Sequence, residues 1–282
     1  MTWRIDVRHT TGYRYEREVL ASYNEARLTP LSTSRQLVIG ARLEVAPATR
    51  LFRYWDHWGS IVHAFDVHVP HDELIVTATS LVETPSARTH PLPEVGWSAI
   101  DDLDLQDKYF ELLTPSRYVD HDPALVAEAA ALRANAPTPA DAVDLATTWV
   151  QSALTYEKGS TSVSTSALDA WRAGRGVCQD FVHLTLALMR AMGIPARYVS
   201  GYFHPRREAE VGEKVVGESH AWAEAWLGEW HPFDPTNGVT PAERHVMVGR
   251  GRDYADVSPL RGLYSGAPSS TPMVTVELIR RR

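Results

Sequence analysis

The sequence predicts an α+β protein in which an N-terminal antiparallel β-sandwich precedes an α+β domain. Three observations predict this order. Apolar and polar side chains alternate with period two through residues 1–85, with no helical stretch between them. Helical spacing takes over after residue 100, and strand patterns return after residue 196. Prolines crowd the polar run between the two parts, so the predicted domains are 1–85 and 101–282, joined by a linker at 86–100.

The strands of the first domain follow from alternation. Residues 37–45 place apolar and polar side chains on opposite faces, and residues 61–69 repeat the pattern. An opening pair of strands is expected within residues 3–15, broken at Thr11-Gly12, and a further strand at 74–83. Several short strands with turn signals between them are typical of an antiparallel sandwich.

The second domain begins with helices. Thr138, Pro139 and Asp141 supply a cap residue, a proline at the first helical position and an acid in the first turn. Gly193 and Pro195 end the last of these helices. Helices are therefore expected at 101–113, 123–134, 139–154 and 178–192, and strands at 197–203, 219–227, 230–233 and, closing the domain, 274–278.

Charge and composition limit the possible partners. The 282 residues include 28 Lys and Arg against 35 Asp and Glu, which gives a net charge of −7 and argues against nucleic acid as the main partner. No run approaches the ~18 apolar residues of a membrane-spanning helix, and the charged N-terminus does not fit a signal peptide. A single cysteine, Cys178, rules out an intramolecular disulfide. We therefore expect a cytoplasmic protein without a membrane partner.

Cys178 is the first candidate for chemistry. It follows Gly174-Arg175-Gly176-Val177, so a flexible turn delivers it to the first turn of a long helix. The positive end of the helix dipole favours thiolate over thiol, and a thiolate beside a base is a competent nucleophile. A buried structural thiol is the alternative, because free cysteines are often fully buried.

His220 and Asp234 supply a matching base and orienting acid. His220 lies on a strand whose even positions carry Trp222, Glu224 and Trp226, while alanines fill the odd positions. Asp234 ends the next predicted strand, 14 residues later, so two adjacent strands would place it beside His220. Taken singly, these two residues also fit a core histidine and a turn-forming aspartate.

Four sequence blocks together resemble the bacterial transglutaminase-like family, whose members include proteins described as cysteine proteases. The blocks are Gly176-Val177-Cys178-Gln179-Asp180-Phe181, Gly193 to Tyr202, Ser219-His220-Ala221-Trp222-Ala223-Glu224 and Asp234-Pro235-Thr236. The resemblance covers residues 110 to 260, and the first 85 residues are similar to the β-rich domain that commonly precedes this core. It implies a papain-like, transglutaminase-like α+β core and a triad of Cys178, His220 and Asp234.

The expected function is acyl transfer through a thioester on Cys178. Water as acceptor would make the protein a protease or amidase acting on a peptide or protein, and an amine would make it a transglutaminase. We favour hydrolysis, because the charged segment 203–214 precedes His220 and would admit water to the site. A non-catalytic binding module is the further alternative. The sequence leaves the oligomeric state open.

Two aromatic residues are candidates for binding substrate. Tyr156 precedes the cysteine where relatives tend to carry an aromatic residue, and its hydroxyl or the Cys178 backbone N–H could stabilise an oxyanion. Trp222 could form a wall of the cleft, although a tryptophan stripe is more often core. Asp180, in contrast, is expected to stabilise the first helical turn.

No cofactor or metal is expected. The rival class is a metal-dependent hydrolase, yet no His-x₃-His pair occurs on a predicted helix. His68 and His71 flank Pro70 at a probable strand end and fit exposed turn residues better than ligands. The chain also lacks a glycine-rich phosphate loop of the Gly-x-x-x-x-Gly-Lys type.

Overall fold

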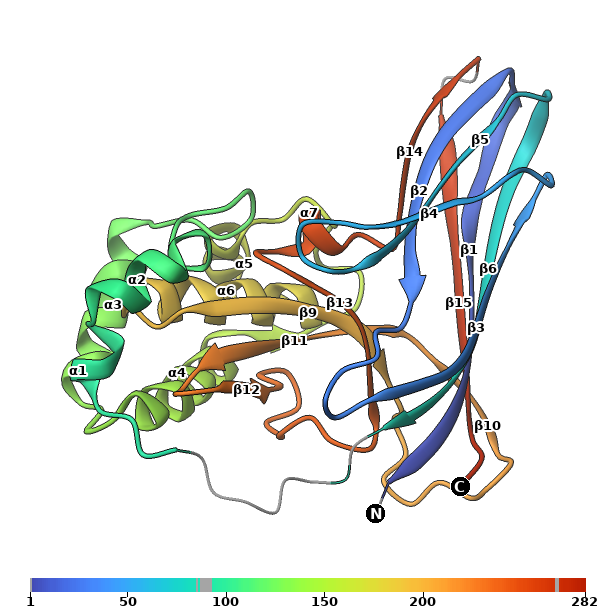
Figure 1. Cartoon of the computed structure of the whole chain (residues 1–282). Coiled ribbons are helices and arrows are strands. Elements are labelled where there is room, and N and C mark those ends of the chain that lie inside the picture. Colours follow the sequence, from blue (N-terminus) through green and yellow to red (C-terminus); the bar gives the residue numbers. More distant parts are fainter. Residues whose placement is uncertain (1, 85, 87–92, 267–268) are drawn as a thin grey trace.

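The computed structural model describes residues 2–84, 86, 93–266 and 269–282, and it shows two halves side by side (Figure 1). One half is a β-sandwich, and the other is an α+β unit with most of its helices on the far side from the sandwich. Both termini lie at the same end of the sandwich. No helix within the described ranges is long and apolar enough to cross a membrane.

The sandwich is built from antiparallel strands in two sheets. The five-stranded sheet has the order β10-β15-β1-β6-β3, and the four-stranded sheet has the order β14-β2-β5-β4. Apolar side chains from both sheets, including Phe65, Leu74 and Leu260, form the core between them. The strands are β1 (Trp3–Val19), β2 (Ala21–Thr29), β3 (Leu37–Ala46), β4 (Phe52–Trp55), β5 (Ile61–Val67), β6 (His71–Thr84), β10 (Lys214–Gly217), β14 (Leu260–Ser265) and β15 (Ser270–Arg280).

The expected break at Thr11-Gly12 is wrong. β1 runs through it, because Gly12 pairs with Ile75 of β6 inside the ladder. A Cβ atom at position 12 would lie 1.8 Å from the carbonyl oxygen of Leu74. Gly12 therefore allows a close approach of two strands and does not form a turn. The strands predicted at 37–45, 61–69 and 74–83 are confirmed as β3, β5 and β6.

The α+β half packs a four-stranded antiparallel sheet, in the order β12-β11-β9-β13, against a buried helix. The helix is α6 (Cys178–Ala191), and the alanine face of β11 lies against it because small side chains permit close packing. The other elements are β9 (Ala196–Phe203), β11 (Ser219–Trp226), β12 (Trp230–Phe233), β13 (His245–Gly251), α3 (Pro123–Ala134), α4 (Pro139–Ala153), α5 (Ala167–Ala173) and α7 (Tyr254–Val257).

The predicted helices at 123–134, 139–154 and 178–192 are confirmed as α3, α4 and α6. Thr138 and Asp141 form the reciprocal capping box that starts α4. The helix expected at 101–113 is instead divided into α2 (Leu103–Lys108) and a 3-10 turn, η1 (Phe110–Leu112). Part of the predicted linker, residues 87–92, lies outside the described residues, and its end forms the short helix α1 (Trp97–Ile100).

The C-terminal strands belong to the sandwich, which corrects the predicted place of the closing strand. β15 pairs with β1 from Ile5↔Arg280 to Tyr15↔Ser270, and β14 pairs with β2. β10, just before His220, pairs with β15. The stretch 101–282 therefore contains three strands of the sandwich, because strand pairing joins segments that are far apart along the chain.

A fragment comprising residues 101–282 is accordingly expected not to fold. It would expose the edges of β14 and β15 that β1 and β2 cover, together with apolar residues such as Val276 and Leu278. Circular dichroism during heating should show a cooperative transition for the full chain and none for the fragment. A fragment that melts cooperatively with native near-UV signal would contradict this expectation.

Candidate active site

The start of α6 presents Cys178 at the surface of the α+β half. The Asp180 carboxylate accepts hydrogen bonds from the Val177 backbone N–H (2.7 Å) and the Thr161 hydroxyl (2.6 Å), which fixes the first turn. Gly176 is required here, because a Cβ atom would lie 2.6 Å from the Cβ of Asp180. As the first residue of the helix, Cys178 is half-buried and its backbone N–H has no intrahelical partner.

The structure brings His220 and Asp234 together through two paired strands. β11 and β12 are antiparallel neighbours, and Asp234 follows the last residue of β12. The Nε2 atom of His220 lies 2.7 Å from Oδ2 of Asp234. The backbone N–H groups of Thr236 and Asn237 donate to Oδ1 of the same carboxylate, so a tight turn fixes its orientation.

The three groups are also coupled electrostatically. Burial alone would lower the pKa of His220, but hydrogen bonds to Asp234 and Cys178 and their charges outweigh it and raise that pKa well above 6.5. Burial would raise the pKa of Asp234, yet its hydrogen bonds to His220 and His245 hold it below the ordinary value of 3.8. His220 is therefore held as an imidazolium between Asp234 and the thiol side chain of Cys178.

Two residues that the sequence did not single out complete this arrangement. The Asn237 amide donates to Oδ2 of Asp234 (2.8 Å) and lies 3.3 Å from Nε2 of His220. His245, from β13, places its Nε2 atom 3.3 Å from the same Oδ2 atom. Asn237 was detectable as part of the turn after Asp234, whereas His245 lies on a strand brought in by tertiary pairing alone.

Tyr156 lies in the site, and Trp222 lies behind it. The short strands β7 (Thr155–Tyr156) and β8 (Arg175–Gly176) pair in parallel and bring Tyr156 to the cavities around Cys178. Burial raises the pKa of Tyr156, with a further contribution from Cys178, so its hydroxyl stays neutral. Trp222 is 1% exposed and stacks on His220 without lining either cavity.

The comparisons with known proteins show the family of this chain. Residues 127–235 match the transglutaminase-like superfamily core, and residues 5–83 match the bacterial transglutaminase-like N-terminal region. This chain belongs to the transglutaminase-like superfamily. Its fold is the transglutaminase-like α+β fold behind a β-rich N-terminal region, as the sequence predicted.

Relatives extend over the whole of this transglutaminase-like chain. An uncharacterized protein of Mycobacterium leprae is 48% identical over 99% of both chains. One of Mycobacterium tuberculosis is 36% identical over 99% of this chain and 93% of its own. The crystal structure of a "putative cysteine protease" from Cytophaga hutchinsonii is 26% identical, with a TM-score of 0.80 over 100% of this chain and 92% of that chain.

Cys178 of this transglutaminase-like protein lies where two cavities meet. One, of about 400 Å³, is lined by Phe203, Val216, Thr236 and Asn237, and the other, of about 470 Å³, extends toward the sandwich. Both share a border that consists of Tyr156, Lys158, Cys178, Gly217, Glu218, Ser219 and His220. A substrate bound across this border would contact the thiol and the imidazole together.

The charged segment 203–214 contributes less to the site than expected. Phe203 and Pro205 line the smaller cavity, but Arg206 pairs with Glu213 within the segment itself. The Arg280 side chain donates to the Ala209 carbonyl, which ties the loop to the end of β15. The expected polar cover over the site is therefore wrong, since hydrogen bonds between Arg280 and both Ala209 and Gly212 hold the middle of this segment against the sandwich.

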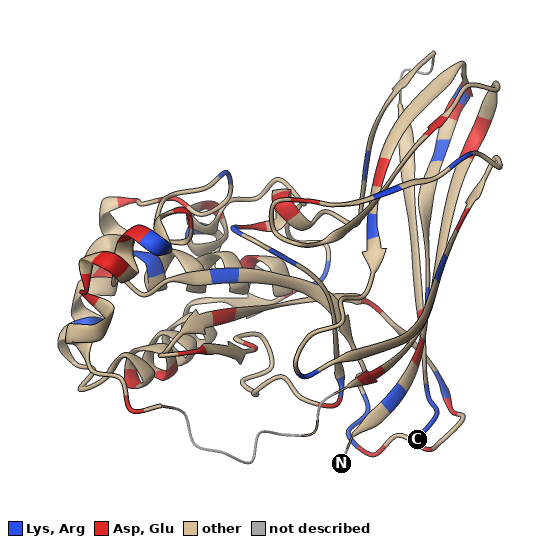
Figure 2. Ribbon diagram, in the orientation of Figure 1, with Lys and Arg blue, Asp and Glu red and all other residues tan. Residues whose placement is uncertain are grey.

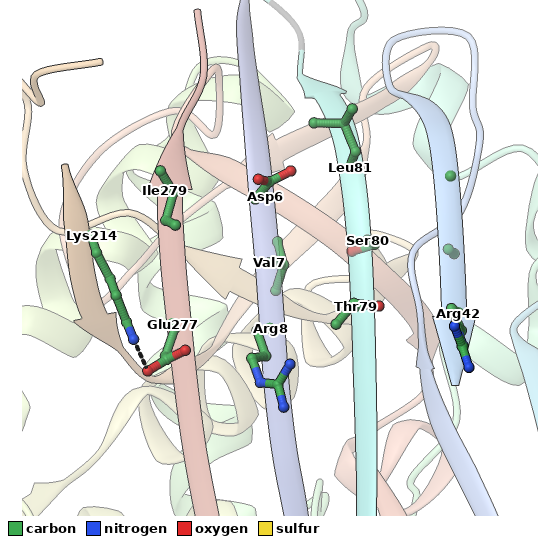
Figure 3. Close-up of a pocket in the computed structure, with 12 residues that line it drawn as sticks. Asp6, Val7, Arg8, Arg42, Thr79, Ser80, Leu81, Lys214, Glu277 and Ile279 are labelled. Carbon is green, nitrogen blue, oxygen red and sulfur yellow. Dashed lines mark ion pairs between the residues drawn. The ribbon is translucent and has the colours of Figure 1, made fainter. Parts of the chain in front are cut away.

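A further hollow, of about 490 Å³, crosses the outer face of the five-stranded sheet (Figure 3). Lys214 and Glu277 form an ion pair there, and Arg8 points into the hollow from the central strand. No cysteine or histidine is among its lining residues. This hollow therefore offers no thiol or imidazole of the kind that the Cys178 cavities contain.

His220, Asp234 and His245 also form a possible ligand set, because one ligand atom from each lies within 4.8 Å of the others. The Nε2 atoms of His220 and His245 both already lie within hydrogen-bond distance of Oδ2 of Asp234, at 2.7 and 3.3 Å. The Asn237 amide also donates a hydrogen bond to Oδ2 of Asp234. The donor set therefore fits a hydrogen-bonded group better than a metal centre.

Activity is accordingly expected to survive EDTA. The measurement compares acyl-enzyme formation before and after dialysis against the chelator, with metal content determined by mass spectrometry. His245→Gln serves as the control, because it would remove one ligand and lower the content of any bound metal. Activity that is lost on chelation and restored by zinc or calcium would refute the absence of a metal cofactor.

Proposed function

We propose that this protein is a cysteine-dependent acyltransferase that hydrolyses a peptide or carboxamide bond through a thioester on Cys178. The observation that carries the proposal is the position of His220, which is hydrogen-bonded to the Asp234 carboxylate and lies with Cys178 on the border of both cavities. An imidazole in this position can exchange protons with the thiol and with a substrate nitrogen. Asp234 fixes its tautomer and stabilises the imidazolium.

The reaction has two steps. The Cys178 thiolate attacks the carbonyl carbon, a carbon–sulfur bond forms, and the carbon–nitrogen bond breaks while His220 gives its proton to the leaving amine. Water then attacks the thioester, His220 accepts a proton from it, and the carboxylic acid and free thiolate are released. Asp234 stays ionised throughout, because its hydrogen bonds hold its pKa low despite its burial.

Two donors are available for the developing oxyanion. The Cys178 backbone N–H has no intrahelical partner and points out of the start of α6. The Tyr156 hydroxyl, neutral because burial raises its pKa, faces the same border between the cavities. Together they would stabilise negative charge on the carbonyl oxygen in the transition state.

Hydrolysis is proposed over amine transfer because the border of the site is polar. Lys158, Glu218, Ser219 and Asn237 line the smaller cavity beside His220. Such a surface keeps water at the thioester, whereas amine transfer requires a dry acceptor channel. Amine transfer is the second candidate, since a protein-glutamine gamma-glutamyltransferase of Pseudomonas aeruginosa is 34% identical over 33% of this chain and 15% of its own.

The experiment that decides is a partition measurement. A peptide or glutamine donor is supplied with a millimolar labelled primary amine, and free acid is quantified against amide product. We expect mostly free acid, with Cys178→Ala giving neither product. Mostly amide at modest amine concentration would replace hydrolysis by transglutamination, and no acyl-enzyme with any donor would favour a binding module.

The proposed setting is the cytoplasm, without nucleic acid or membrane as partner. Cys178 has to stay reduced to act as a nucleophile, and it is the one cysteine of the chain. Acidic and basic residues are interspersed over both halves, as Figure 2 shows, and the net charge of −7 does not favour a phosphate backbone. The proposed substrate is a peptide or protein.

A further inference from the structure

The two cavities that meet at Cys178 differ in chemistry. Lys158 and Glu218 lie on their shared border and form an ion pair (2.6 Å between Nζ and Oε1). Among the lining residues within the described parts of the chain, these two are the formally charged side chains other than the His220 imidazolium. They neutralise each other, so neither cavity offers an uncompensated lysine, arginine or carboxylate away from the reacting groups.

Beyond the border that it shares with the smaller cavity, the larger cavity is mostly apolar, and it lies between the two halves of the protein. The sandwich contributes Pro259 from the approach to β14, and Val274 and Val276 from β15. The α+β half supplies the facing wall, with Val163, Val177, Tyr198, Ala221 and Tyr254 among its members. Val274 and Val163 are 59% and 60% exposed, so they offer apolar surface that a ligand can cover.

The residues next to the shared border distinguish the two cavities. Val177 and Gln179, on either side of Cys178 at the start of α6, line the larger cavity. The carbonyl oxygen of an acyl donor would point at that helix start. Thr236 and Asn237, from the turn that holds Asp234, line the smaller cavity instead. The leaving amine has to meet His220, which Asn237 also approaches.

From these observations we propose that the larger cavity is the acyl-donor subsite and selects an uncharged apolar side chain on the acyl side of the scissile bond. This inference rests on the proposed function and names its substrate class. The smaller cavity would take the amine that leaves, or the water that replaces it. The sandwich thus supplies one wall of the larger cavity through β15. The same strand also pairs with β10, which lies just before His220 in the chain.

The test separates binding from chemistry. Binding of N-acetylated tripeptide amides with Leu, Asp or Lys as the acyl residue is measured by calorimetry on Cys178→Ala, which cannot react. We expect the Leu peptide to bind at least about tenfold more tightly than the other two, because burying one large aliphatic side chain is worth ~1.5–3 kcal/mol. Equal binding of the three peptides would overturn the proposal.

Two variants from opposite walls locate the site. Val274→Glu and Val163→Glu, each added to Cys178→Ala, should each weaken binding of the Leu peptide at least about tenfold, since a carboxylate would face the apolar ligand. Leu263→Glu is the matched control, because Leu263 is 78% exposed on the sandwich and lines neither cavity. All three positions are exposed, so the variants should keep the wild-type melting temperature within a few degrees.

A third variant distinguishes the two cavities. Val216 is 76% exposed and lines the smaller cavity, so Val216→Glu should leave the preference for Leu unchanged. Loss of Leu binding in Val216→Glu but not in Val274→Glu would reverse the assignment and overturn the proposal. Acyl-enzyme formation by the wild-type protein is recorded separately by mass spectrometry, so a failure of the proposed chemistry is distinguishable from a failure of the subsite.

Discussion

Replacing Cys178 with alanine is expected to abolish acyl-enzyme formation and turnover. Cys178 is the only sulfur nucleophile of the chain, and it lies at the start of α6 beside His220. The described residues that line both cavities include no second thiol. Mass spectrometry of the protein after incubation with a peptide or thioester donor should show the acyl adduct in the wild type and none in the variant.

The fold should tolerate this substitution. Cys178 is half-buried and contributes a small side chain to the edge of the core, so the free energy of unfolding should change by no more than about 1–2 kcal/mol. Alkylation by iodoacetamide provides an independent measurement, with rapid reaction at neutral pH expected for the wild type. No alkylation of the folded protein, or full turnover by Cys178→Ala, would remove Cys178 from the mechanism.

Asp234→Asn is expected to lower turnover by about 10²–10⁴-fold without unfolding the protein. The amide keeps the shape of the carboxylate but loses the charge that holds His220 as an imidazolium. Its NH₂ group would also face donors from Asn237 and His245. The measurement is kcat with a peptide donor, alongside thermal melting of both proteins.

Asp56→Asn is the matched control for this change. Asp56 is also a largely buried acid, paired with Arg27 (3.0 Å) in the sandwich and away from Cys178. It should melt at a lower temperature while kcat stays close to the wild-type value. Unchanged kcat in Asp234→Asn would exclude Asp234 from the proposed triad, whatever its effect on stability.

Asp234→Asn should also alter how the free energy of unfolding depends on pH. In the wild type the pKa of His220 is raised and that of Asp234 is lowered, despite the opposing effect of burial on each. The ion pair therefore contributes fully to the free energy of unfolding at a pH above the ordinary pKa of Asp234 and below the ordinary pKa of His220. This contribution is lost as the pH falls through the lowered pKa of Asp234. It is also lost as the pH rises through the raised pKa of His220. Urea unfolding from pH 6 to 10 should show the difference between wild type and Asp234→Asn shrinking at alkaline pH.

Local patterns in the sequence were sufficient for much of the site. The helix start at Cys178 follows from a glycine turn and apolar spacing, both of which act within a few residues. The strand that carries His220 shows its two faces by alternation, and Asp234 follows it after one short strand. The pairing of β11 with β12 is itself nearly local, so the contact between His220 and Asp234 was predictable without long-range information.

Alternation along β11 shows which side chains share a face, but it does not show what covers that face. Trp222 was therefore a candidate for the cleft, and tertiary packing buries it behind His220. His245 illustrates the same limit, because β13 reaches Asp234 through its pairing with β9. Neither position carries a local signal for its neighbours.

The sequence alone predicted the α+β class and the order of the two halves, since both depend on short-range periodicity and on turns. It indicated the three residues proposed for chemistry through the helix start, the adjacent strands and the resemblance of four sequence blocks to a known family. Only the tertiary structure decided that β10, β14 and β15 complete the sandwich and that Val274 and Val276 line a cavity beside Cys178. A strand's partner is set by hydrogen bonds and packing between segments that are distant in the chain, here up to 275 positions apart between Ile5 and Arg280. Such pairings leave no periodic trace in the sequence of either strand.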